Sequence, residues 1–303
     1  MPLVPIPEHL TRSASAGWGD VGRRWVGGLP DVVASVLADW DLALGELMPP
    51  SLHWVAAVTR MDGQRAVLKV GPVEPQHLPV EAEALRMFGG RGSVRLLRED
   101  KARGALLLER AMPGTSLESL VPASDEQATA ALVDTMLALH RPVPAQCRLP
   151  SVLGQRADLD RHVRTHGLLP ARLVDRASRL FAELSADGSD QVVLHGDLHH
   201  GNLVRAQRSP WLAIDPHGSV GDRGYEVGSV LFNPNPYDRD PGLLSLVPAR
   251  VEQLADGLDL PVERVVAWGF VKAVLSQVWT CETVAAQVTR DLDVAVLLEP
   301  RLC

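Results

Sequence analysis

The sequence contains few cysteines, and they are poorly placed for cross-links. Cys147, Cys281 and Cys303 are the only three among 303 residues, and they stand far apart in the chain. A disulfide framework requires an even number of cysteines at closer spacings. The chain is therefore not expected to depend on disulfides, which is typical of a protein in a reducing, cytoplasmic compartment.

A long hydrophobic run is also missing. A membrane-spanning helix requires about 18 or more consecutive apolar residues, and the nearest approach to one, residues 265–279, contains Lys272. The N-terminal segment carries three prolines and has no basic residue ahead of an apolar stretch, unlike a secretory signal. We expect a cytoplasmic globular protein without a membrane partner.

An excess of positive charge is absent as well. Lysine and arginine total 30 against 37 aspartates and glutamates, which gives a net charge of −7. A phosphate backbone is bound through clustered cations, so nucleic acid is not an expected partner. Acidic side chains that line a cleft would instead attract a small cationic molecule.

The first part of the chain has the pattern of a small sheet domain. Periodicity and an Asp62–Gly63 turn predict strands and helices in a defined order. The expected elements are a helix at 31–40, strands at 53–59 and 65–70, a helix at 80–88, and strands at 94–97 and 105–108.

The remainder is predicted to be mainly helical. Residues 124–127 form a capping box ahead of a helix that reaches about His140. Pro170 and Pro261 are each expected to open a further helix, the second ending near Gln287.

One strand pair, 203–205 with 211–214, interrupts these helices. We therefore predict an α+β, two-lobed fold, with a small β-sheet lobe over residues 1–110 and a larger, mainly helical lobe over residues 111–303. The cleft between two such lobes is the expected place for a ligand.

The densest polar cluster lies between an apolar run and this strand pair. Residues 194–203 read LHGDLHHGNL, and Asp215 follows the second strand of the pair. A tight loop would present Asp197 and Asn202 side by side, and the hairpin would return Asp215 to the same space. Two carboxylates and an amide oxygen are suitable ligands for Mg²⁺, and such a site suits phosphoryl transfer.

Two other interpretations of this cluster remain open. It can be an ordinary loop, in which Asp197 makes a turn and Gly201 takes a positive φ angle. It can also be a metal-dependent hydrolase site, because His195, His199 and His200, together with Asp197, are common metal ligands.

A second candidate is Lys69, one of only three lysines in the chain. Because most basic positions are arginine, a lysine at the centre of a strand indicates a need for a compact ammonium that reaches nucleotide phosphates. The alternative is a lysine on the solvent face of the strand. Either Glu81 or Glu83 on the following helix would be its partner.

Together these motifs resemble the aminoglycoside phosphotransferase family, which has a two-lobed, protein-kinase-like fold. The matching elements run in the expected order from residue 67 to residue 226, and the stretches around Asp197 and Asp215 are most similar to the branch of streptomycin 6-phosphotransferases and hydroxyurea phosphotransferases. The matching elements are VLK at 67–69, EAEAL at 81–85, LLERAMPG at 107–114, HGD at 195–197 with Asn202, ID at 214–215 and GD at 221–222.

The resemblance implies a role for each matching residue. Asp197 would orient the substrate hydroxyl and accept its proton, while Asn202 and Asp215 would hold Mg²⁺. Lys69, fixed by Glu81, would contact the phosphates of ATP or GTP. Backbone groups near Glu109, Ala111 and Met112 would bind the adenine, and His195 would support the catalytic loop.

The sequence also departs from the family pattern. The turn at residues 47–53 has no glycine, so Ser51 and its neighbouring amides are the candidates for covering the phosphates, because Pro49 and Pro50 lack N–H groups. Glu226 stands where family members often have aspartate. Pro216 and His217 follow Asp215 where protein kinases have Phe-Gly, which favours a small-molecule substrate over a protein.

The expected substrate is a small cationic molecule, most simply an aminoglycoside such as streptomycin, phosphorylated at its 6-hydroxyl with antibiotic resistance as the result. Asp158, Asp160 and Glu282 are the candidate acids, with Trp279 beside Glu282 as a cation–π partner. Hydroxyurea or another small alcohol, and a non-enzymatic kinase-like binding module, remain alternatives.

Overall fold

The computed structural model describes residues 4–48, 52–74, 77–165, 169–186, 188, 191–283 and 287–302. The chain forms two compact units. Unit 1 contains Met1–Gly90 and Val94–Met112, and unit 2 contains Arg91–Ser93 and Pro113–Cys303. Within the described ranges, no helix is both long enough and apolar enough to cross a membrane.

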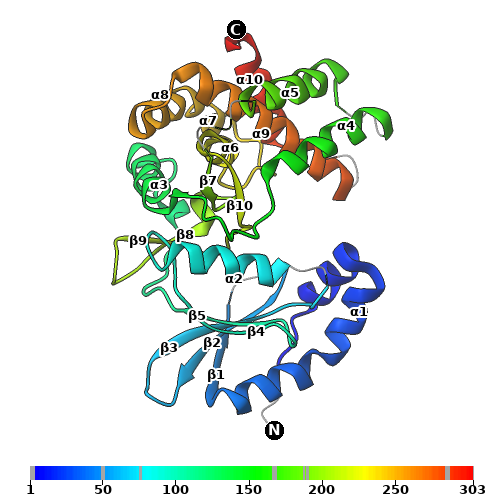
Figure 1. Cartoon of the computed structure of the whole chain (residues 1–303), viewed down its shortest axis with the longest axis vertical. Coiled ribbons are helices and arrows are strands. Elements are labelled where there is room, and N and C mark those ends of the chain that lie inside the picture. Colours follow the sequence, from blue (N-terminus) through cyan, green and yellow to red (C-terminus); the bar gives the residue numbers. More distant parts are fainter. Residues whose placement is uncertain are drawn as a thin grey trace. The chain divides into compact units, whose positions relative to one another are not determined.

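Unit 1 is an antiparallel five-stranded sheet with two helices (Figure 1). The strand order is β1-β2-β3-β5-β4. The elements are α1 (Glu8–Asp39), β1 (Leu42–Leu47), β2 (Trp54–Arg60), β3 (Arg65–Val70), α2 (His77–Phe88), β4 (Leu96–Asp100) and β5 (Ala105–Glu109).

The predicted hairpin, helix and following strand pair of unit 1 all form within a few residues of the expected positions. Gly63 adopts a φ of 78° in the turn between β2 and β3, as an Asp-Gly hairpin requires. The alternating apolar residues of β2 and β3 pack with Leu29, Val33 and Val36 of α1 into one core.

The helix predicted over residues 31–40 is only the end of a much longer one. The helix α1 begins at Glu8 and contains a kink at Gly19, where φ is 54°, and Pro30 within its length. Glycine and proline weaken helix propensity, so the local sequence pattern did not predict the part of α1 that precedes residue 31. Burial of Leu10 and Leu29 supplies the missing stabilisation.

Strand β1 was not predicted from the sequence either. It is an edge strand that pairs with β2 and contains Gly45. A Cβ atom on Gly45 would lie 3.0 Å from the carbonyl oxygen of Ala57, so the glycine allows close approach of the two strands.

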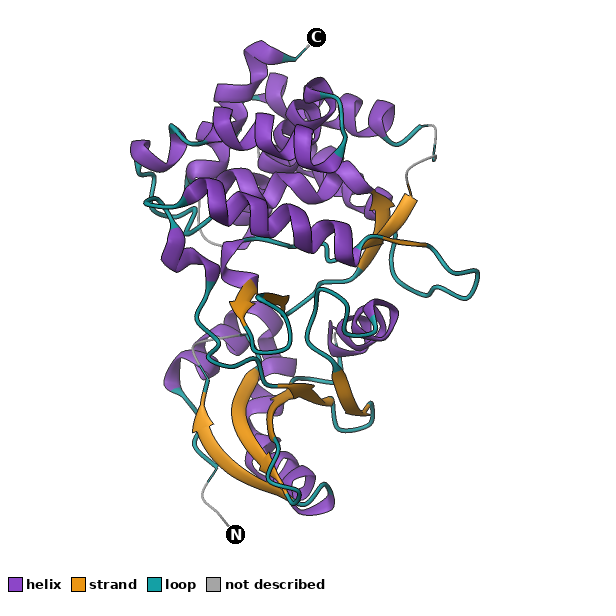
Figure 2. Ribbon diagram, turned by 90° about the vertical axis from the view of Figure 1, so that its left-hand side faces the viewer, coloured by secondary structure: helices purple, strands orange, loops and turns teal. Residues whose placement is uncertain are grey.

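Unit 2 is mainly helical and carries two small sheets, β10-β7-β6 and β8-β9 (Figure 2). Its strands are β6 (Arg141–Pro142), β7 (Gln191–Leu194), β8 (Leu203–Arg205), β9 (Trp211–Ala213) and β10 (Ser219–Asp222). Its helices are α3 (Asp125–Leu139), α4 (Arg156–Thr165), α5 (Ala171–Leu184), α6 (Val227–Phe232), α7 (Pro241–Leu244), α8 (Val247–Leu258), α9 (Val262–Thr283) and α10 (Arg290–Leu298).

Short 3-10 turns complete unit 2. They are η1 (Leu117–Leu120), η2 (Val152–Gln155), η3 (His200–Asn202), η4 (Arg223–Glu226) and η5 (Glu299–Arg301).

The predicted helices of unit 2 form and begin within one residue of the expected positions, with Val262 following Pro261 at the start of α9. No capping box forms at residues 124–127: the side chain of Ser124 makes no cap hydrogen bond, and its backbone N–H donates to Leu120 O at 2.7 Å. The chain thus enters α3 from a turn over residues 121–124 that follows η1, without an extended cap residue. Pro170 is the residue before α5 rather than its first residue.

Helix α9 is the central element of unit 2 and contacts α5, α6, α8 and α10. Trp268 on α9 is fully buried and packs edge-on against Phe181 and Tyr225, with ring centroids 5.4 and 5.6 Å away. Such edge-to-face pairs add to the free energy of apolar burial. This packing gives the polar loops of unit 2 a rigid support.

Candidate active site

The loop that carries Asp197 begins at the end of the buried strand β7. Gly196 has a φ of 87°, a conformation that side chains other than glycine rarely adopt. A Cβ atom there would also lie 3.2 Å from Ser219 Oγ and 3.3 Å from His217 Cβ. Glycine is therefore required for the turn that presents Asp197.

Glu226 holds the backbone of this loop. Its carboxylate accepts hydrogen bonds from the N–H groups of His195 at 2.8 Å and Gly196 at 2.9 Å, and His140 lies 3.8 Å away. Burial raises the pKa of Glu226, but the nearby His140 side chain and the N–H donor of His195 outweigh it, and the pKa lies below its ordinary value. In the sequence, Glu226 differed from the family pattern, which often has aspartate at this position. In the structure, the longer glutamate side chain reaches two backbone N–H donors.

His195 is fully buried and supports the loop from inside. Its Nε2 lies 2.9 Å from Ile214 O, and its Nδ1 accepts a hydrogen bond from Asp197 N at 3.4 Å. The pKa of His195 is lowered because burial disfavours the charged ring. The neutral ring therefore joins the loop to the end of β9, as the support role requires.

The hairpin β8–β9 brings the two predicted magnesium ligands together in the backbone. Ile214 N donates to Asn202 O at 2.9 Å, which places Asp215 next to Asn202 across the hairpin. Asn202 Nδ2 donates to Asp197 O at 2.9 Å. Because the amide nitrogen is used in this way, the amide oxygen is the end that can bind a cation, and an amide plus a carboxylate fits Mg²⁺.

The carboxylate of Asp197 lies among donors and is 30% exposed. Ser229 Oγ donates to one oxygen at 3.3 Å, while His199 Nε2 and His217 Nε2 lie 3.6 and 3.9 Å from the other. His199 Nδ1 accepts from Gly201 N at 3.0 Å, so its proton sits on Nε2, facing Asp197.

These neighbours determine the charge of Asp197. Burial raises the pKa of Asp197, but the facing Nε2–H of His199, the ring of His217 and the charge of Lys272 lower it far more. The pKa lies well below its ordinary value. Asp197 is consequently ionised at neutral pH and able to accept a hydrogen bond from a substrate hydroxyl.

A metal-dependent hydrolase would need a cluster of metal ligands. In the part of the chain that the structure describes, no group of three His, Cys, Asp or Glu side chains could hold a metal ion. His195 and His200 are fully buried, and the pKa of His200 lies well below its ordinary value because of burial and the charge of Arg250. Gly201 does not have a positive φ either.

Lys69, in unit 1, lies on β3 and is buried rather than solvent-facing. Its Nζ donates to Glu81 Oε2 on α2 at 2.6 Å, and both side chains are about 95% buried. Glu83 is 3.4 Å from Arg86 instead. The structure thus selects Glu81 as the partner of Lys69.

The residues predicted to cover the nucleotide are only partly described. Ser51, with Pro49 and Pro50, lies outside the described residues. Glu109 ends β5, where its N–H donates to Arg95 O at 2.9 Å and its carboxylate accepts from Arg95 N at 3.0 Å. Ala111 and Met112 follow as the last residues of unit 1, and their contact with adenine stays a prediction.

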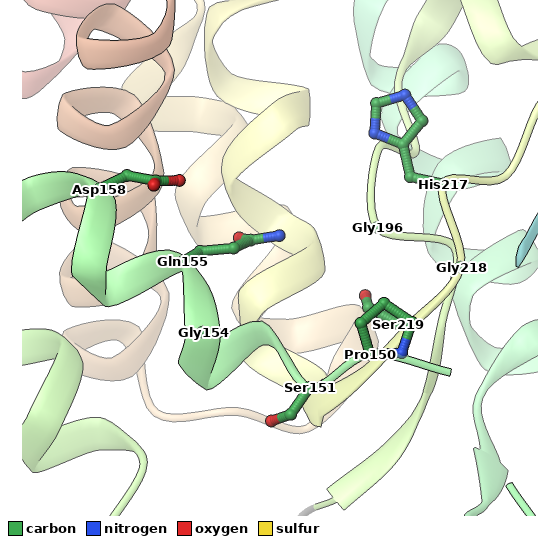
Figure 3. A pocket seen from close by; sticks show the side chains of 9 residues that line it. All are labelled: Pro150, Ser151, Gly154, Gln155, Asp158, Gly196, His217, Gly218 and Ser219. Atoms are coloured by element: carbon green, nitrogen blue, oxygen red, sulfur yellow. The ribbon is translucent and has the colours of Figure 1, made fainter. Parts of the chain in front are cut away.

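A pocket of about 270 Å³ opens beside Gly196 in unit 2. Figure 3 shows Asp158 and Gln155 on one wall and His217 on the other. Ser219 is 4% exposed, and its Oγ has no hydrogen-bond partner although it lines the pocket. The lining residues are Pro150, Ser151, Gly154, Gln155, Asp158, Gly196, His217, Gly218 and Ser219.

The predicted substrate acids have different surroundings. Asp158 lines the pocket, accepts from Trp279 Nε1 at 2.9 Å and pairs with Arg161 at 2.7 Å. Glu282 lies 3.4 Å from the same Arg161 but does not line the pocket. Asp160 accepts a hydrogen bond from Ser178 on α5 at 2.8 Å. Trp279 itself is partly buried.

Comparison with known proteins adds evidence of a different kind. A family model described as "Aminoglycoside/hydroxyurea antibiotic resistance kinase" matches residues 49–283. The chain belongs to this kinase family. Its resemblance to the aminoglycoside phosphotransferases is thereby confirmed, and the protein is a phosphotransferase that acts on a hydroxyl group.

Individual relatives of the kinase agree with this assignment. It is 31% identical to streptomycin 6-kinase of Streptomyces griseus over 92% of each chain. It is 33% identical to hydroxyurea phosphotransferase of Kitasatospora aureofaciens, over 92% of this chain and 81% of the relative.

The fold of the kinase is also that of known structures. The crystal structure of choline kinase LicA from Streptococcus pneumoniae superposes with a TM-score of 0.62, at 9% identity, and the match covers 90% of this chain and 98% of that one. The protein-kinase-like α+β fold expected from the sequence is confirmed.

Proposed function

We propose that this kinase transfers the γ-phosphate of ATP to a hydroxyl of an aminoglycoside, with the 6-hydroxyl of streptomycin as the first candidate, and so confers resistance. Support comes from the family, from a streptomycin 6-kinase at 31% identity, and from a pocket next to the loop of Asp197 to which Asp158 contributes a carboxylate.

In this proposal Asp197 aligns the acceptor hydroxyl and takes its proton as the oxygen attacks the γ-phosphorus. The bond from that phosphorus to the bridging oxygen breaks, and ADP leaves. A low pKa makes Asp197 a weak base in the ground state, so its main contributions are alignment and acceptance of a proton that becomes acidic as the new P–O bond forms.

Lys69 and a metal ion bound by Asn202 and Asp215 are proposed to contact the phosphates. Asn202 and Asp215 are the proposed ligands of Mg²⁺, which when bound neutralises the charge on the phosphates. Lys69 would contact phosphate oxygens, and Glu81 would fix its ammonium at 2.6 Å. Lys69→Ala is expected to impair the positioning of the phosphates.

Asp158 is the proposed recognition group for a cationic acceptor. Its partner Arg161 has a side chain that is 52% exposed, and ion pairs of this kind contribute little stability. A guanidinium of the acceptor could therefore replace Arg161 and bind the carboxylate with two hydrogen bonds. Trp279 would hold the other side of Asp158 in place.

The decisive experiment measures ATP consumption with streptomycin, other aminoglycosides and hydroxyurea, each repeated with GTP. Asp158→Asn should raise KM for streptomycin about tenfold, the worth of one charged hydrogen bond, and leave KM for ATP unchanged. Asp160→Asn makes the same chemical change two residues away on α4 and is the matched control. The same variant also tests the prediction that Asp160 binds substrate.

Hydroxyurea is the second candidate, because a hydroxyurea phosphotransferase is 33% identical to this chain. It carries no guanidinium, so Asp158→Asn should alter its KM much less than that of streptomycin. Turnover of hydroxyurea with none of any aminoglycoside would overturn the first proposal in favour of the second.

A further inference from the structure

Lys272 is one of the buried charged groups to which the mechanism above gives no role. Lys272 lies in the middle of α9, is 3% exposed, and sits in the apolar interior of unit 2. Burying an ammonium is costly unless it is hydrogen-bonded and paired. A methionine would fill the same space at lower cost, so the charge calls for an explanation.

The contacts of Lys272 lead to the active-site loop. Its Nζ donates to Gly196 O, the carbonyl directly before Asp197, at 3.2 Å, and to Tyr225 Oη at 2.6 Å. It also lies 4.3 Å from the ring centroid of Tyr225 and 5.1 Å from that of Trp279. Two acceptors and two aromatic faces therefore surround the ammonium.

The contact of Lys272 with Tyr225 also connects it to the pocket. The hydroxyl of Tyr225 donates to Gln155 Oε1, and Gln155 lines the pocket. Because the amide oxygen is taken by Tyr225, the amide nitrogen is the end left to face a ligand. Figure 3 shows this nitrogen pointing into the pocket.

We propose that Lys272 is a positioning residue that fixes the Gly196 carbonyl, and with it Asp197, and that it orients Gln155 toward the acceptor through Tyr225. The proposal rests on the proposed phosphotransfer at Asp197. One ammonium would thereby set the geometry of both the proton acceptor and the acceptor pocket, without touching the substrate itself.

The packing of α6 supports this assignment. A Cβ atom on Gly228 would lie 2.2 Å from Lys272 Cβ and 2.4 Å from Cγ. The glycine allows α6 to lie directly on the stem of Lys272, so the side chain has little freedom to leave its acceptors.

The charge state of Lys272 supplies a distinctive signature. Burial lowers the pKa of Lys272 to about 8, although the nearby carboxylates of Asp197, Glu226 and Asp291 act to raise it. The facing group from η4, Tyr225, has a pKa raised well above its ordinary value by burial and so stays neutral. Around pH 8 the ammonium becomes an amine and its bond to Gly196 O loses charge assistance.

The test compares Lys272→Met, Lys272→Arg and Tyr225→Phe with the wild type on one acceptor. Lys272→Met should lower kcat about tenfold or more, with KM for ATP unchanged. Tyr225→Phe, which keeps the bond to Gly196 O, should chiefly raise KM for the acceptor. Wild-type kcat should fall as pH rises through about 8, whereas Lys272→Arg should hold its kcat to higher pH, because arginine stays charged.

A second measurement requires no substrate and separates this inference from the proposed function. In urea unfolding, wild-type stability should rise from about pH 8 toward 10.5, because only the unfolded chain keeps the proton across that range. Lys272→Met should lack this rise. A wild type without the rise, or Lys272→Met with kcat within twofold of the wild type, overturns the role of Lys272. Absence of phosphotransfer with every acceptor overturns the proposed function alone.

Discussion

The charge on Asp197 results from side chains that come from three later parts of the sequence. His199 comes from its own loop, His217 from beyond β9, and Lys272 from α9. Together they offset the burial of the carboxylate and keep it ionised. The residue is thus prepared to bind a hydroxyl before any substrate arrives.

Replacing Asp197 by asparagine tests this assignment. The amide fits the same space but cannot accept a proton, so kcat should fall by about 10²–10⁴, whereas the thermal midpoint should change little. Steady-state turnover and thermal unfolding measure the two quantities. More than a tenth of wild-type turnover would exclude Asp197 as the proton acceptor.

Much of this residue-level chemistry follows from sequence motifs, and some does not. The pattern His-Gly-Asp with Asn202 and Asp215 located the polar loop because these residues are close in sequence. Glu226, Lys272 and Ser219 meet that loop only after folding, so no local spacing marks them. Two signals were usable: the departure from the family pattern at Glu226, and the rarity of lysine, since Lys272 is one of three lysines but only Lys69 was interpreted.

At the scale of elements, Gly228 is one of the glycines that allow the close contact of α6 with α9. Because a Cβ atom on Gly228 would overlap the stem of Lys272, Gly228→Ala should destabilise the protein by about 1–3 kcal/mol, the usual cost of overpacking. It should also lower kcat, because Lys272 must shift. Urea unfolding and turnover give the two numbers.

Gly28→Ala is the matched control for that substitution. Gly28 lies in α1 and a Cβ atom there would meet nothing within 4 Å, so alanine should be neutral or slightly stabilising. Equal destabilisation by both substitutions would show that the contact between α6 and α9 is not tight.

The elements also show where local patterns succeed and fail. Strands β2 and β3 and helix α2 have clear periodicity and turn residues, and their prediction was confirmed. Helix α1 contains glycine and proline, and β1 contains glycine, so both depend on tertiary packing for their stability. The start of α3 was predicted correctly, but the expected capping-box hydrogen bond of Ser124 does not form.

At the scale of the whole molecule, stability should depend on a buried acid that lies outside the sequence motifs. Burial raises the pKa of Asp291 on α10 to about 6, although the nearby Ser276 and Thr289 act to lower it. Between pH 3.8 and about 6 the folded protein therefore binds more protons than the unfolded chain. The unfolding free energy should fall as pH rises through this range.

Asp291→Asn should remove this contribution. The variant should be more stable than the wild type at pH 7 by about 1–3 kcal/mol, the equivalent of one to two units of pKa, and the difference should shrink toward pH 4. Urea unfolding at several pH values measures it. A constant difference across the range would show that Asp291 does not titrate there.

The division of the chain into units has a consequence for cutting and rejoining it. The short segment Arg91–Ser93 belongs to unit 2 although unit 1 residues flank it on both sides. There Gly92 O accepts from Ala213 N at 2.8 Å, and Ser93 O accepts from Arg208 at 2.8 Å. A fragment that starts at Pro113 would lack these partners of the β8–β9 hairpin. The chain therefore cannot be divided between Met112 and Pro113 into two parts that are each fully stable alone. A fragment that starts at Pro113 should unfold at a lower urea concentration than the intact chain. Adding a synthetic peptide that covers residues 91–93 with its neighbours should restore part of the lost stability.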